Sequence, residues 1–264
     1  MRTRRKKIRL FIRRTIVCIC GAGILYLFAA GTAAVISGIS MRIRPQETQA
    51  ASSVSGRAVS MSAAAAQKLS VPAAAPDEEN FDGALFIGDS RTEGLENYNG
   101  LQGAQYYAIK GLMVNTVYTK PAVESDGEKV TVMQALRKSQ FSRVYVMLGV
   151  NELGWSNTDK FIEDYTKMVE DIKQYQPQAK IFLQSILPVS EKKSVSDKIY
   201  NNDKISVYNT EIEKIAEREN VYYLKVNTAV SNSGGYLPEE ASPDGVHLNR
   251  KYCKIWCDYL RTHI

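Results

Sequence analysis

The clearest pattern in residues 81–264 is an alternation of short apolar runs with longer amphipathic stretches. Apolar runs rich in β-branched and aromatic residues, each ended by Gly, Pro or a polar cluster, predict buried strands. They lie at residues 84–87, 105–109, 143–148, 180–187 and 221–226. Apolar side chains at helical spacing predict helices at residues 130–138, 158–175, 203–220 and from 249 to the C-terminus.

Strands that alternate with helices pair in parallel through right-handed crossovers, and the helices cover both faces of the sheet. The sequence therefore predicts the α/β class, with three layers in the order α/β/α. The sheet is expected to be doubly wound, mostly parallel and flavodoxin-like, with about five strands. Residues 81–264 form this domain.

The first 80 residues follow a different pattern. Residues 1–14 are densely basic, and residues 15–41 carry no charge and are mostly apolar. About 20 apolar residues are enough to cross a bilayer, and positive charge before them keeps the N-terminus in the cytoplasm. Residues 15–41 thus predict a transmembrane anchor, and residues 42–80, rich in Ala, Ser and Pro, predict a flexible linker.

The alternative to an anchor is a cleaved signal peptide, whose apolar core usually has only ~7–15 residues. Small residues at 29–34 and 50–51 are compatible with a cleavage site, and cleavage there would release a secreted protein. The longer apolar run favours a single-pass membrane protein with an extracytoplasmic domain, for which the lipid bilayer is a partner.

The charge of the chain is unevenly distributed around a formal net value of +6. Twelve Lys or Arg and one acidic residue precede Asp77, whereas 22 basic and 27 acidic residues make up the rest. The globular part is mildly acidic, which predicts no nucleic-acid partner. Cys253 and Cys257 are expected to be small buried residues, and two histidines are too few for a metal cluster, so neither metal nor cofactor is expected.

Polar residues that can do chemistry follow the ends of the predicted strands. Ser90 follows the first strand, Gly111 the second and Asn151 the third, while Asp244 and His247 lie in the loop before the last helix. The carboxyl ends of parallel strands meet at one edge of an open sheet. These five residues are therefore expected to surround one cleft.

The set has the roles that acyl transfer requires. Ser90 is the candidate nucleophile, and an imidazole such as that of His247 removes its proton at neutral pH. Asp244, three residues earlier, is placed to orient the imidazole. The backbone N–H groups of Ser90 and Gly111 and the amide of Asn151 are candidate oxyanion donors, each typically worth ~10²–10³ in rate.

Each residue taken singly has a simpler explanation. Asp89 or Ser90 can simply cap the next helix, Gly111 can be a turn glycine, Asn151 an Asx turn or cap, and Asp244 a turn residue. Their combination, in this order and at strand ends, favours chemistry. The nucleophile elbow of other hydrolases does not apply, because Thr92 stands where its second Gly is needed.

Residues 81–264 resemble the SGNH (GDSL) hydrolase family. Its blocks correspond to Gly-Asp-Ser ending at Ser90, to Gly111, to Gly-Val-Asn ending at Asn151, and to Asp-Gly-Val-His-Leu from Asp244 to Leu248. The resemblance implies a metal-independent serine hydrolase with Ser90, His247 and Asp244 as catalytic residues and Ser90, Gly111 and Asn151 as the oxyanion hole.

Two positions depart from the pattern of this family. Arg91 replaces the usual Leu, and Glu152 the usual Asp. Neither change removes a reacting group, and Arg91 either favours an anionic or sugar-acid substrate or is a solvated first-turn residue.

The function expected from these residues is hydrolysis of O-acyl esters, above all O-acetyl groups, on small molecules, carbohydrate or cell-wall polymer. One alternative is an O-acyltransferase that uses the same site with a sugar hydroxyl as acceptor. The other is a non-catalytic surface binding module, which the presence of nucleophile, base and carboxylate disfavours.

Overall fold

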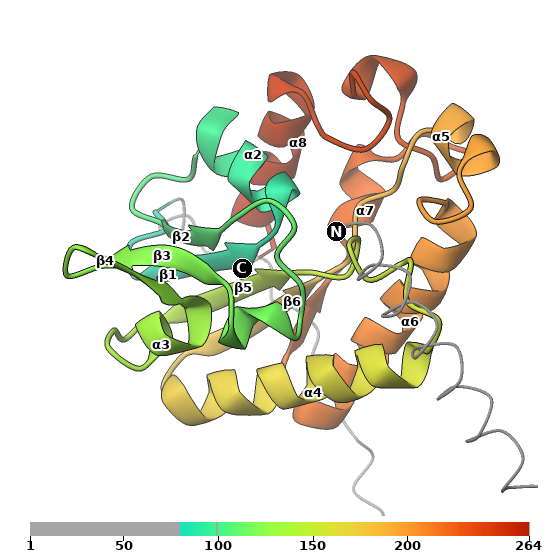
Figure 1. Cartoon of the computed structure of the whole chain (residues 1–264). Helices are drawn as coiled ribbons and strands as arrows, with labels where there is room; N and C mark the ends of the chain where they lie inside the picture. The colour runs from blue at the N-terminus through green and yellow to red at the C-terminus, as the bar shows by residue number, and fades with distance from the viewer. Residues whose placement is uncertain (1–79, 99, 264) are drawn as a thin grey trace, which may run out of the picture. The chain divides into compact units, whose positions relative to one another are not determined.

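Five parallel strands form the central sheet of the computed structural model, which describes residues 80–98 and 100–263 (Figure 1). The strands are β1 (Ala84–Gly88), β2 (Gln105–Ala108), β5 (Arg143–Met147), β6 (Lys180–Gln184) and β7 (Tyr222–Leu224). Their order in the sheet is β2-β1-β5-β6-β7, and each neighbouring pair is parallel. This is the flavodoxin-like order, so the predicted fold class is confirmed.

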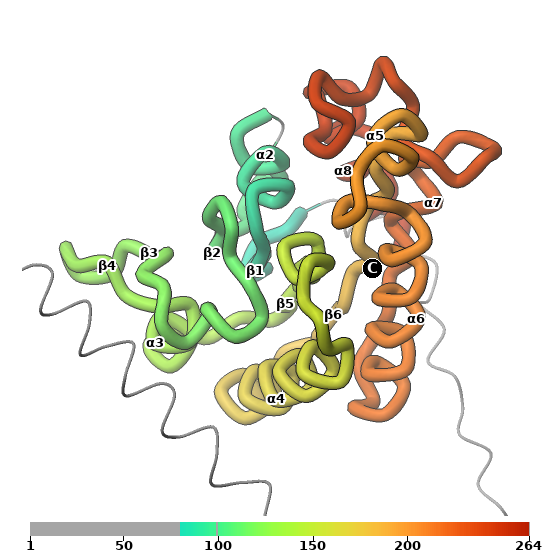
Figure 2. Tube along the Cα trace, turned by 45° about the vertical axis from the view of Figure 1, so that its right-hand side comes forward, coloured from blue at the N-terminus to red at the C-terminus, as the bar shows by residue number. Residues whose placement is uncertain are grey.

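Helices cover both faces of the sheet and complete the three layers (Figures 1 and 2). One face is covered by α3 (Val132–Leu136), α4 (Thr158–Tyr175) and α6 (Asn202–Glu219), and the other by α2 (Ser90–Tyr98), α7 (Val226–Val230) and α8 (Arg250–Arg261). Successive strand side chains alternate between faces, so Leu85 and Ile87 enter the first core while Phe86 enters the second.

An aromatic ladder crosses all five strands on the α2–α8 face. Tyr106, Phe86, Tyr145, Phe182 and Tyr222 stack in that order, with centroid separations of 5.3, 4.6, 4.7 and 4.9 Å. Each neighbouring pair stands directly opposite in the strand register, so the ladder fixes that register.

Both ends of α4 are the predicted ones, and the side chain of Asn157 caps its start by accepting hydrogen bonds from the N–H groups of Asp159 and Lys160. The predicted helix at 130–138 was too long. Its first residues belong to a hairpin of β3 (Pro121–Ser125) and β4 (Glu128–Thr131), and α3 starts after a capping box at Thr131. Asp126 and Gly127, both with positive φ, form the hairpin turn.

The strands predicted at 180–187 and 221–226 are shorter than expected, since β6 ends at Gln184 and α7 begins at Val226. Four short elements were not predicted besides the hairpin: the helices α5 (Glu191–Ser196) and α7, and the 3₁₀ turns η1 (Thr116–Tyr118) and η2 (Glu239–Ala241). Cys253 and Cys257 are buried and free, as expected.

The predicted cytoplasmic tail, anchor and linker lie outside the described residues. Across residues 80–98 and 100–263, none of the helices has the length and apolar character needed to cross a bilayer. Within the same residues, no three His, Cys, Asp or Glu side chains are grouped to hold a metal ion.

Candidate active site

Ser90 stands at the junction of β1 and α2, at the carboxyl edge of the sheet. The carboxylate of Asp89 accepts a hydrogen bond of 2.9 Å from the N–H of Arg91 and so caps the new helix. A Cβ on Gly88 would lie 2.0 Å from Oγ1 of Thr92, so only glycine allows the helix to turn this close to the strand. The sharp turn fixes Ser90 in the first turn of α2.

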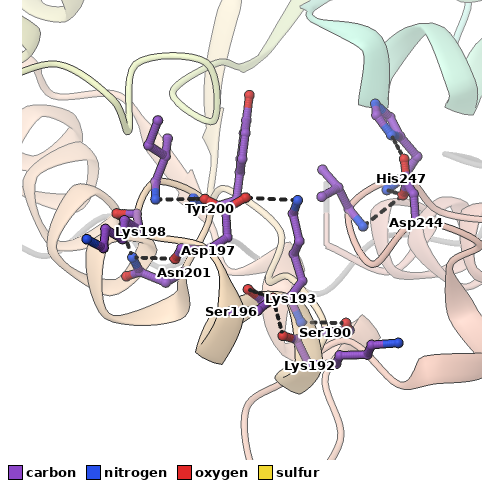
Figure 3. A network of polar contacts seen from close by, with 12 residues as sticks. Ser190, Lys192, Lys193, Ser196, Asp197, Lys198, Tyr200, Asn201, Asp244 and His247 are labelled. Atoms are coloured by element: carbon purple, nitrogen blue, oxygen red, sulfur yellow. Dashed lines mark hydrogen bonds and ion pairs between the residues drawn. The ribbon is translucent and has the colours of Figure 1, made fainter.

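The structure brings the hydroxyl of Ser90 together with the imidazole of His247, 157 positions later in the chain. Oγ of Ser90 lies 2.9 Å from Nε2 of His247, and Nδ1 of His247 lies 2.6 Å from Oδ2 of Asp244. Figure 3 shows the contact between the imidazole and the carboxylate. With the Nδ1 proton donated to Asp244, Nε2 is free to accept from the serine hydroxyl. The three predicted residues thus form one hydrogen-bonded chain.

The carboxylate of Asp244 is held by its own loop. Its Oδ1 accepts hydrogen bonds from the N–H groups of Val246 and His247, at 2.9 and 2.8 Å. Burial by itself raises the pKa of Asp244, but the hydrogen bonds from His247 and Val246 outweigh it and hold the pKa below its usual range. Asp244 therefore stays ionised beside the imidazole at neutral pH.

Gly245 fixes the loop that carries Asp244 and His247. Its φ of +78° is in the left-handed region, and its carbonyl accepts a 2.9 Å hydrogen bond from the N–H of Ser190. A Cβ on Gly245 would lie 2.7 Å from Oγ of Ser190, labelled in Figure 3. The segment before α5 therefore helps to position the loop that carries the imidazole, a role that was not predicted.

The two remaining predicted residues lie in the loops that follow β2 and β5. The amide Nδ2 of Asn151 donates to the carbonyl of Leu112 at 3.0 Å, and Oδ2 of Asp89 is 3.4 Å away. Leu112 follows Gly111 and Asp89 precedes Ser90, so these two hydrogen bonds connect the Asn151 amide to the segments of both other predicted oxyanion donors. The 3.4 Å hydrogen bond to Asp89 is weak, so the amide N–H that makes it can more easily donate to a substrate oxygen instead.

Glu152 is a buried residue of the site whose structural role was not predicted. Its side chain is fully buried, and Oε1 accepts a 2.7 Å hydrogen bond from the N–H of Val114. The bond ties the Asn151 loop to the Gly111 loop. Burial raises the pKa of Glu152 to about 8, assisted by the negative charge of Asp89. The carboxyl therefore keeps its proton at neutral pH.

The raised pKa of Glu152 predicts a pH-dependent stability. The unfolded chain releases this proton near pH 4.3, so the folded state binds one more proton between about pH 4.3 and 8. Stability therefore falls as pH rises through that window. Glu152→Gln keeps an acceptor for Val114 and removes the titration. Urea unfolding from pH 5 to 9 is expected to show a shallower decline in the variant, by a few kcal/mol at about 1.4 kcal/mol per pKa unit. An equal decline of the free energy of unfolding in the wild type and the variant would contradict the raised pKa of Glu152.

Arg91 is buried, so the interpretation as a solvated first-turn residue was wrong. Its side chain is 3% exposed, and Nη1 donates to the carbonyl of Leu187 at 2.7 Å. Burial lowers the pKa of Arg91 to about 10, against the opposing effect of Asp89 and Asp244. The guanidinium is thus a buried charged group next to Ser90, held through Nη1 by the backbone of Leu187.

Sheet order and site together define an α/β acyl hydrolase with a serine at the carboxyl edge of its first strand. The chain belongs to the GDSL-like lipase/acylhydrolase family, whose sequence pattern matches residues 86–252. It is accordingly an enzyme, a carboxylic ester hydrolase of the GDSL type.

Known proteins similar to this chain include enzymes that act on acetyl esters. This chain is 26% identical over 205 residues to the isoamyl acetate-hydrolyzing esterase of Saccharomyces cerevisiae, and the match covers 70% of this chain and 85% of the relative. A GDSL-like lipase from Bacteroides thetaiotaomicron has a TM-score of 0.53 at 19% identity, covering 72% of this chain and 89% of that structure. Est24, a carbohydrate acetylesterase from Sinorhizobium meliloti, has a TM-score of 0.50 at 14% identity, covering 67% and 95%.

Proposed function

We propose that this protein is a membrane-tethered, extracytoplasmic esterase that removes O-acetyl groups from carbohydrate through a covalent acyl-enzyme on Ser90. The observation that carries the mechanism is the chain of hydrogen bonds from Ser90 to His247 to Asp244, at 2.9 and 2.6 Å. A hydroxyl, an imidazole and an ionised carboxylate in this order are the parts of a serine nucleophile with its base.

In the proposed reaction, Oγ of Ser90 attacks the ester carbonyl carbon while its proton passes to Nε2 of His247. The tetrahedral intermediate collapses by breaking the bond to the alcohol oxygen, which takes the proton from His247 and leaves. Water, deprotonated by His247, then attacks the acyl-serine. The bond from the acyl carbon to Oγ of Ser90 breaks, His247 returns the proton to Oγ, and the carboxylic acid is released. The ionised Asp244 stabilises the imidazolium that forms in each half of the reaction.

The developing oxyanion is assigned to donors on the β2 and β5 side of Ser90. The N–H of Ser90 lies at the start of α2, where the helix dipole favours negative charge. The amide of Asn151 and the N–H of Gly111 complete the set, and Glu152 holds their two loops together through Val114. Losing one such donor typically costs ~10²–10³ in rate.

The proposed acetyl specificity is tested by a panel of esters with a constant alcohol. The full chain, purified in detergent, is assayed with p-nitrophenyl acetate, butyrate and octanoate and with acetylated oligosaccharides. We expect kcat/KM for acetate to exceed that for octanoate at least about tenfold, because each extra methylene has to find apolar space. Equal or rising rates with chain length would overturn the acetyl preference, and transfer of acetyl to added saccharide instead of water would favour the transferase.

The proposed location rests on residues 1–41, where a basic segment precedes a long uncharged apolar run. When the full chain is expressed in bacteria, we expect it to sediment with membranes and to resist carbonate extraction. Protease added to spheroplasts is expected to degrade residues 80–264. A shortened chain in the medium would show cleavage of the N-terminal segment, and protection from protease would contradict the outward orientation.

A further inference from the structure

A cleft of about 300 Å³ opens beside Ser90 and His247, between α2 and the loop that leads into α8. One wall is formed by α2, through Glu93, Gly94, Asn97 and Tyr98, and the other by Pro243 and Leu248. Of the described residues, those that line the cleft include the nucleophile and the base but neither Gly111 nor Asn151.

The position of the cleft decides which part of an ester it holds. The carbonyl oxygen must face the oxyanion donors, which lie on the side of Asn151. The alcohol oxygen must lie near Nε2 of His247, because that atom protonates it as it leaves. A cleft that contains His247 but not Asn151 is therefore on the alcohol side of the scissile bond.

The chemistry of the walls fits a polyhydroxylated alcohol. The side chains of Glu93 and Asn97 offer hydrogen-bonding groups, and the ring of Tyr98 is exposed, at 42% of its surface. Arg250 lies over this ring, with its guanidinium carbon 5.6 Å from the centroid, and holds the end of α2 by a hydrogen bond to the carbonyl of Tyr98. A sugar has apolar ring faces for an aromatic side chain and hydroxyl edges for the polar ones.

Charged side chains of both signs border the cleft. Glu93 places a carboxylate on the wall, and Arg91, whose Nη1 donates to the carbonyl of Leu187, lines the cleft as well. We propose that the cleft along α2 binds the alcohol portion of the substrate, and that this portion is a saccharide. The assignment rests on the proposed esterase function and adds to it the place of the leaving group.

Gly94 offers a direct test, because a Cβ at this position would meet no atom within 4 Å. Gly94→Leu fills the cleft from the middle of α2 and replaces a poor helix former by a good one, so the helix is not weakened. The assay compares two acetates that differ only in their alcohol, methyl acetate and 6-O-acetylglucose. We expect the ratio of kcat/KM for the sugar ester to that for methyl acetate to fall about tenfold or more.

Glu96→Leu is the matched control, since Glu96 lies exposed on the same helix and does not line the cleft. This variant is expected to leave both rates unchanged. An unchanged ratio in Gly94→Leu, with melting temperature retained, would overturn the assignment of the cleft. A wild-type enzyme inert towards both acetates would instead overturn the proposed function, so the two failures are distinguishable.

Glu93→Gln tests, independently of size, whether the side chain of Glu93 faces the bound alcohol. Acetylated glucuronate and acetylated glucose are compared at low ionic strength, where exposed charges act most strongly. We expect the variant to raise the kcat/KM ratio of the anionic to the neutral ester about two- to fivefold, which 0.5 M salt should largely abolish. No change in this ratio would show that Glu93 does not face the alcohol.

Discussion

Ser90→Ala is expected to lower kcat for ester hydrolysis by about 10⁴-fold or more, because the acyl-enzyme no longer has an oxygen on which to form. The remaining rate comes from binding and from the oxyanion donors alone. The measurement is release of p-nitrophenol from p-nitrophenyl acetate, together with labelling of the protein by a fluorophosphonate. The wild type is expected to be labelled at one serine and the variant not at all.

Ser206→Ala provides the matched control, since Ser206 lies exposed on α6, a helix of the opposite face of the sheet. Its activity and labelling should equal those of the wild type. If Ser90→Ala kept more than a tenth of the wild-type rate, the nucleophile would have to be assigned to another residue, and the proposed mechanism would be wrong.

Asp244→Asn is expected to lower kcat by about 10²–10⁴-fold while leaving KM within a factor of about three. The amide no longer carries the charge that stabilises the imidazolium, and it can present a donor to Nδ1 of His247. Nε2 would then carry the proton and not accept one from Ser90, whose Oγ lies 2.9 Å away. Steady-state kinetics with p-nitrophenyl acetate separate the two parameters.

The control for this substitution is Asp203→Asn, which changes an exposed carboxylate in the first turn of α6. It should affect neither parameter. A rise in KM without a fall in kcat for Asp244→Asn would mean that Asp244 acts in substrate binding instead of orienting the base.

The hydrophobic pattern was sufficient to predict the sheet and its main helices, since each of these elements buries a regular set of apolar side chains. The start of α4 was predicted to the residue because its cap, Asn157, can be recognised in the sequence. The hairpin of β3 and β4 was missed although Asp126-Gly127 is a strong turn dipeptide. Its strands are largely exposed and polar, so they lack the apolar run that identified the others.

In the site, too, the features that depend on local sequence were predicted, and those that depend on tertiary packing were not. The meeting of Ser90 with His247 and Asp244 was predictable, because Ser90 follows a strand, the other two lie in the loop before the last helix, and the three residue types suit one reaction. The burial of Arg91 and Glu152 was not predictable from the sequence, since it depends on segments distant in the chain, such as those of Leu187 and Val114. Charged residue types are usually exposed, and only packing reveals the exceptions.

The span of 157 positions between Ser90 and His247 has a consequence for the biogenesis of the enzyme. A ribosome has to make the segment up to residue 247 before the base exists, and α8 must then dock through its buried Trp256, whose Nε1 donates to Gln184 on β6. Under the proposed mechanism, the nascent polypeptide therefore carries an unactivated serine until its C-terminal helix is in place. Ester turnover would thus report completed folding, and truncations that remove α8 should silence the protein even when all five strands of the sheet have formed.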